Sequence, residues 1–103
     1  MQPSVIHTFF KAVALVVLLS VAACETTPPA QEMSDARQAI AVAREAGAEE
    51  HASFHLKAAE DYLESARRAL NAGAYAEARF NAKQAKVKAL DALQEAESSA
   101  TKD

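Results

Sequence analysis

The feature that most constrains this chain is a row of alanines near its C-terminus, spaced alternately by four and three residues. The row contains Ala78, Ala82, Ala85, Ala89, Ala92 and Ala96. Steps of three and four place residues on one face of an α-helix, and a face of small side chains lets a neighbouring helix come close. We therefore expect a helix from Ala74 or Tyr75 to Glu97 that packs through this alanine seam.

The composition favours an all-α protein. Alanine supplies 26 of the 103 residues, whereas the chain has 2 glycines, 3 prolines, no tryptophan and only 6% aromatic residues. β-Sandwiches and barrels need β-branched and aromatic residues with many turns, so these folds are excluded. One cysteine excludes a disulfide-rich scaffold. A net charge of −3 gives no basic footprint, so we expect no nucleic-acid partner.

Two earlier segments show the same helical spacing. The apolar positions of residues 32–46 are Met33, Ala36, Ile40 and Ala43. Those of residues 53–71 are Leu56, Ala59, Leu63, Ala66 and Leu70. Ser53 is the expected N-cap of the second segment, and Gly47 suits the positive φ that follows a helix.

The very short connection at Gly73 predicts that the second and third segments fold back on each other. The predicted fold is an antiparallel helical hairpin with a third, N-terminal helix, which makes a small two- or three-helix bundle over residues 32–97. Residues 98–103 are polar, and we expect them to form a frayed tail.

Residues 1–23 have the pattern of an export signal. Lys11 supplies positive charge, residues 12–19 carry no polar side chain, and small residues precede Cys24. The apolar run is shorter than the ~20 residues that a membrane-spanning helix needs. We predict a signal peptide that is cleaved between Ala23 and Cys24.

The sequence Val21-Ala22-Ala23-Cys24 resembles the bacterial lipobox, in which the cysteine is lipidated and becomes the first mature residue. The resemblance implies covalent diacylglycerol and an N-acyl chain on Cys24, with no other cofactor, and several acyl chains anchor a protein stably. Glu25 is not the aspartate that signals inner-membrane retention in that family. The implied location is the periplasmic face of the outer membrane, with the inner membrane as the alternative. Residues 24–31 form a short tether.

Three stretches carry a second resemblance, namely ARQAIAVAREAGAEE, LKAAEDYLESARRALNAGAYAEA and an alanine-rich run ending in KALDAL. Together they are similar to a family of short bacterial lipoproteins known only as a domain of unknown function. Some relatives are joined to an OmpA-like peptidoglycan-binding domain. The resemblance covers residues 36–93 only, so peptidoglycan binding is not carried over. The family supplies no activity and no catalytic residue.

Few residues predict chemistry. His51 and His55 are a weak candidate metal pair if a helix begins by position 51, and two surface histidines are the simpler interpretation. Ala52 stands where the zinc-protease motif requires glutamate, so that hydrolysis is excluded. We expect no small-molecule substrate and no enzymatic activity. A small basic cluster of Lys83, Lys86 and Lys88 could touch an anionic polymer or lipid, or simply keep the helix soluble.

Phe80 and Val87 lie seven residues apart, near the opposite side of the last helix from the alanine seam, and are the candidate partner surface. The core is expected to be thin, because thirteen larger apolar side chains between Met33 and Leu93 serve the whole domain. Pairing with a second copy or with an envelope protein would cover the exposed ones.

We therefore expect a non-enzymatic lipoprotein that binds membrane lipid through Cys24 and acts as a structural or interaction module of the bacterial envelope. One alternative is a peptidoglycan-associated spacer lipoprotein joined through a terminal lysine, although Lys102 is followed by Asp103. Another is a weak envelope metal-binding protein that uses His51 and His55.

Overall fold

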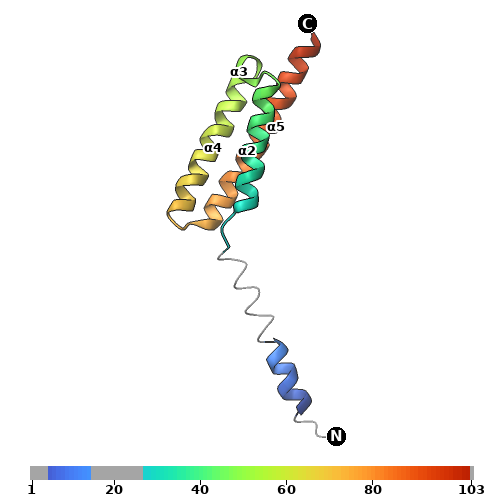
Figure 1. Cartoon of the computed structure of the whole chain (residues 1–103), viewed down its shortest axis with the longest axis vertical. Helices are drawn as coiled ribbons and strands as arrows, with labels where there is room; N and C mark the ends of the chain where they lie inside the picture. The colour runs from blue at the N-terminus through green and yellow to red at the C-terminus, as the bar shows by residue number, and fades with distance from the viewer. Residues whose placement is uncertain (1–4, 15–26, 103) are drawn as a thin grey trace.

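The structure, a computed structural model, describes residues 5–14 and 27–102. Residues 5–14 are helical, and the second range contains α2 (Ala30–Glu45), α3 (Ala48–His51), α4 (Ser53–Asn71) and α5 (Tyr75–Lys102) (Figure 1). Neither described range contains a strand, which confirms the all-α class. Within the same ranges, no helix has the length and apolar character needed to cross a membrane.

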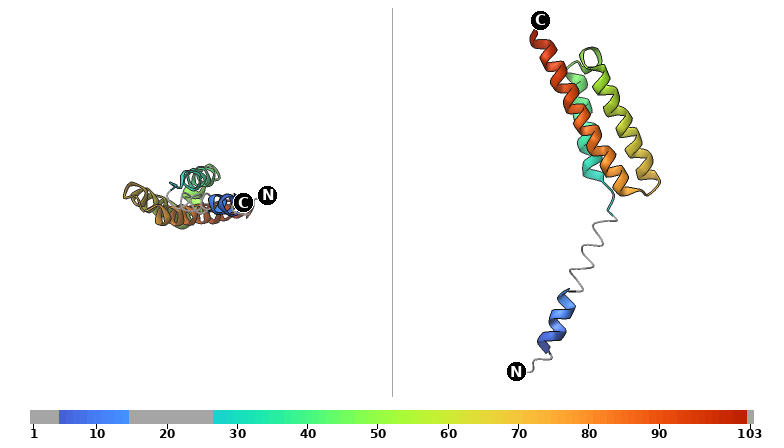
Figure 2. Two further views of the ribbon diagram at one scale, coloured as in Figure 1. Left: turned by 90° about the horizontal axis from the view of Figure 1, so that it is seen from below. Right: turned by 180° about the vertical axis from the view of Figure 1, so that it is seen from behind.

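The helices α2, α4 and α5 lie side by side. α4 and α5 run in opposite directions and make the most extensive helix contact, while α2 packs against both of them and runs in the same direction as α5 (Figure 1). In the end-on view of Figure 2, α2 covers one side of the layer formed by α4 and α5. The short helix α3 joins α2 to α4 at the end of the bundle remote from the α4–α5 turn.

The alanine seam of α5 lies at the centre of the bundle. All six of its alanines are completely buried. α2 contributes Met33, Ala36, Ile40 and Ala43, and α4 contributes Leu56, Ala59, Ala66 and Ala69. Most of these side chains are single methyl groups, so α2 and α4 approach α5 closely. The expected thin core is confirmed in the described residues.

Both glycines sit where positive φ ends a helix. Gly47 has φ 91° and Gly73 has φ 75°. After α4, the N–H of Gly73 donates to the carbonyl of Leu70 at 3.0 Å and that of Ala74 donates to Ala69 at 2.8 Å. This pair of bonds is a Schellman motif, which satisfies carbonyls that the helix end leaves free. The chain therefore reverses direction in very few residues.

α4 has the predicted bounds, Ser53–Asn71, but its N-cap differs from the prediction. Ser53 is the first helical residue and not the N-cap, a position that Ala52 occupies with φ −147° and ψ 39° and no side-chain cap bond. The reason lies in the short helix α3, which continues the chain beyond Gly47 and places Ala52 in the core, 3% exposed. Burial of the small Ala52 methyl group thus sets the helix start, and Ser53 is left exposed.

Both ends of the domain extend further than predicted. α2 begins at Ala30, because the carbonyl of Pro29 accepts a bond from Met33 N–H at 3.0 Å and closes the first turn. α5 continues to Lys102, so the expected frayed tail is helical as far as that residue. Within this last part of the helix, Ser99 Oγ donates to the carbonyl of Glu95 at 3.0 Å.

The alanine seam leads to a prediction about the side-chain size that it tolerates. Replacing Ala89 with leucine should lower the free energy of unfolding by about 1–3 kcal/mol, because a larger side chain forces closely packed helices apart. Ala41→Leu makes the same chemical change at an exposed position of α2, and should change stability by less than about 0.5 kcal/mol. Urea unfolding followed by circular dichroism measures both. Equal stability of the two variants would contradict close packing at the seam.

Candidate functional site

The segment that leads into α2 is held against α5 by Arg79. Arg79 Nη2 donates to the main-chain carbonyl of Thr27 at 2.9 Å, and Arg79 Nε lies 3.4 Å from Glu32 Oε1. Pro29, between these two points, is fully buried. We call these contacts the Arg79 clamp. Cys24 and Ala23 lie outside the described residues, but Cys24 is three residues from Thr27 and so within about 10 Å of it.

The predicted partner residues lie on the outer side of α5. Phe80 is 59% exposed and Val87 is 48% exposed. They are two helical turns apart and point away from the alanine seam. The structure adds Leu90, which is 46% exposed. It follows Val87 by three residues, a spacing that could have identified it. We call Phe80, Val87 and Leu90 the outer strip.

The apolar surface continues from Leu90 toward α2. A groove of about 210 Å³ lies between the two helices, and Val42, Leu90 and Leu93 provide its apolar lining. Its polar edge includes Lys86 and Asp35, whose Nζ and Oδ2 atoms are 4.0 Å apart. The outer strip is therefore part of a wider partly apolar surface shared by α5 and α2.

The two histidines do not share one helix face. The helix that the metal hypothesis required is interrupted at Ala52, so His51 ends α3 and His55 belongs to α4. His51 Nε2 lies 3.9 Å from Glu50 Oε2, whereas His55 Nε2 lies 3.5 Å from Glu95 Oε2. Nothing in residues 5–14 and 27–102 groups three or more His, Cys, Asp or Glu side chains for a metal ion.

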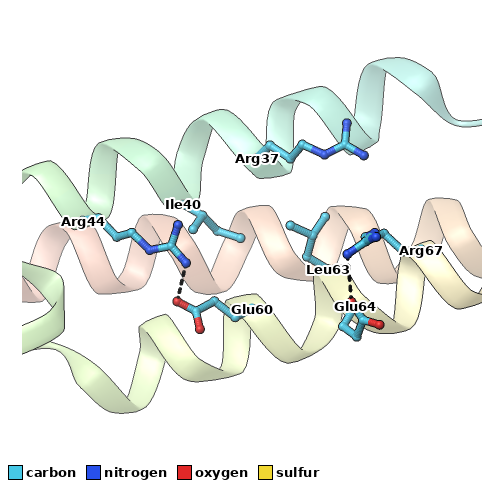
Figure 3. Close-up of a pocket in the computed structure, with 7 residues that line it drawn as sticks. All are labelled: Arg37, Ile40, Arg44, Glu60, Leu63, Glu64 and Arg67. Atoms are coloured by element: carbon cyan, nitrogen blue, oxygen red, sulfur yellow. Dashed lines mark hydrogen bonds and ion pairs between the residues drawn. The ribbon is translucent and has the colours of Figure 1, made fainter.

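A charged groove that no sequence pattern indicated lies between α2 and α4 (Figure 3). Arg44 Nη2 donates to Glu60 Oε1 at 2.7 Å, which ties the two helices together. Arg67 pairs with Glu64 at 3.2 Å within α4, as their spacing of three predicts. Arg37 also lines the groove and makes no ion pair in the described part of the chain. All of these charged side chains are in contact with solvent.

The comparisons with known proteins give a family and no activity. The family model described as "Domain of unknown function (DUF4398)" matches residues 31–103. The chain belongs to this family. The match spans α2 to α5, so the DUF4398 region coincides with the helical bundle, and the expected membership of a family without known function is confirmed. No curated protein and no solved structure matches the chain.

The Arg79 clamp leads to a prediction about amide hydrogen exchange at the start of α2. Arg79→Gln should speed amide hydrogen exchange in the first turn of α2 by about 1.4- to 5-fold, because a partly exposed ion pair contributes about 0.2–1 kcal/mol. Arg68→Gln is the matched control, since Arg68 contacts Glu64 of its own helix at 3.8 Å. If amide exchange is unchanged by Arg79→Gln, burial of Pro29 is enough to hold the start of α2 in place without the Arg79 contacts.

Proposed function

We propose that this DUF4398 chain is a lipoprotein of the bacterial envelope, anchored through lipid on Cys24 to the periplasmic face of the outer membrane. Its helical bundle acts as a non-enzymatic structural or interaction module, with the outer strip as its contact surface. The lipobox-like sequence before the chain's one cysteine supports the anchor. The proposal takes cleavage after Ala23, which makes Cys24 the first residue of the mature protein.

The observation that carries this proposal is the Arg79 clamp. Because the Thr27 carbonyl is bound to Arg79 of α5, lipid on Cys24 would hold the bundle close to the membrane. A protein held in this way meets its partners within a short distance of the lipid. Its surface carboxylates support a non-enzymatic role, because Glu60 and Glu64 already pair with arginines in an open groove.

The anchor is tested by labelling growing cells with radioactive palmitate and separating membranes from soluble periplasm. We expect label on the wild-type protein and its recovery with the membrane, and complete loss of both for Cys24→Ala. Thr26→Ala keeps the thiol and should behave as wild type. Unlabelled wild-type protein, or equal release of wild type and Cys24→Ala, would refute the lipoprotein assignment.

One observation favours a peptidoglycan-linked spacer as the second candidate. α5 runs from the end of the bundle where α2 begins to the opposite end, and Lys102 is the last residue of α5 (Figure 1). Its 28 residues span about 42 Å. Such a chain would stand upright, with lipid at one end and the lysine at the other. The histidine pair has less support, because His51 and His55 face different carboxylates.

The spacer makes its own prediction. A wall-linked protein should change its mobility in a denaturing gel after muramidase digestion, and Lys102→Arg should abolish that change. Lys57→Arg, an exposed lysine of α4, is the control that should retain it. Wild-type mobility that is the same with and without muramidase would remove the spacer and leave the interaction module.

A further inference from the structure

The outer strip is bordered by positive charge. Four basic residues and no acidic residue occur between positions 79 and 88, whereas Asp91, Glu95 and Glu97 follow on the same helix. At about 100° per residue, Lys83 and Lys88 fall on opposite sides of the line through Phe80 and Val87. Between Arg79 and Lys88 the outward face of α5 is therefore apolar along its middle and basic at its edges, and the exposed Glu77 lies on the same face just before this stretch.

The acidic groups of α2 neutralise only part of this charge. Glu32 faces Arg79 at 3.4 Å, and Asp35 faces Lys86 at 4.0 Å. Lys83 and Lys88 make no ion pair within residues 27–102. Their two charges are available to an external anion, and they lie on both sides of exposed apolar side chains.

The tether leaves the bundle beside the same strip. Arg79, which holds the Thr27 carbonyl, directly precedes Phe80 in α5. Cys24 precedes Thr27 by only three positions, a reach of about 10 Å. If Cys24 carries lipid, its acyl chains enter a membrane next to Phe80. The anchor and the strip can then engage one continuous surface.

We propose that the outer strip docks on an anionic phospholipid surface. Phe80, Val87 and Leu90 enter the boundary between headgroups and acyl chains, and Lys83 and Lys88 contact lipid phosphates, as in other interfacial amphipathic helices. The proposal rests on the proposed lipid anchor and names the partner of the outer strip. The bundle then lies with the first half of α5 along the membrane, while the acidic second half is not attracted to it.

A second copy of the chain is a less favourable occupant of the strip. Two copies anchored side by side in the same orientation would bring their basic half-helices together, and like charges repel. An anionic membrane offers the opposite charge to Lys83 and Lys88. Charge complementarity and the position of the tether therefore both favour lipid.

Tryptophan fluorescence can test the docking, because the chain has no tryptophan of its own. The lipidated full-length mature protein is reconstituted into vesicles of phosphatidylcholine and phosphatidylglycerol whose acyl chains carry bromine, a quencher. We expect at least about twofold quenching for Phe80→Trp, since interfacial docking places the ring at the acyl boundary. Phe54→Trp is the matched control. Phe54 is 81% exposed at the start of α4, at the opposite end of the bundle, and should stay unquenched (Figure 1).

The electrostatic part is tested in the Phe80→Trp background. Adding Lys83→Gln and Lys88→Gln, or omitting phosphatidylglycerol, should reduce the quenching, and so should high salt. Lys57→Gln with Lys102→Gln removes the same charge from other exposed positions and should leave the quenching intact. Circular dichroism checks that each variant is folded.

Three results would overturn the docking. One is equal quenching of the Phe80→Trp and Phe54→Trp variants, and another is the absence of quenching in both. The third is Phe80→Trp emission that depends on protein concentration and not on lipid composition, which identifies a second copy as the occupant. These outcomes concern protein already inserted by its acyl chains. Failure of the anchor itself appears separately, as protein that carries no palmitate and does not enter vesicles.

Discussion

Close contact between α5 and its two neighbours is the constraint on which the rest of the structure depends. Six alanines in register leave no large side chain to hold the helices apart, so α2 and α4 must bring mainly small groups to meet them. The core consequently gains stability from close fit more than from buried area, because each methyl group removes little apolar surface from water. The uninterrupted row of alanines on α5 defines how the three helices pack.

That constraint also explains why large apolar residues remain outside. A helix whose inner face is reserved for alanine has no room there for phenylalanine or valine, and Phe80 and Val87 occupy the outer face of α5. Exposed apolar residues that occur singly need no explanation. Here they line up with Leu90 and are flanked by lysines, and this order is what makes them a candidate contact surface.

Local patterns in the sequence predicted much of this fold. The spacing of alanines identified the buried face of α5, and the positive φ of Gly47 and Gly73 follows from their positions after periodic segments. Interactions between distant segments were beyond such reasoning. Ser53 has the right chemistry for a cap, yet burial of Ala52 decided the helix start.

The Arg79 clamp could not be predicted from the sequence either, because Arg79 and Thr27 lie 52 positions apart. Arg79 binds the main-chain carbonyl of residue 27, a group that every amino acid possesses. This contact does not use the side chain of residue 27, whereas the buried Pro29 and the second partner of Arg79, Glu32, contribute through their side chains. Substitutions at Pro29, Glu32 or Arg79 are thus the changes during evolution that would alter how the chain enters the bundle.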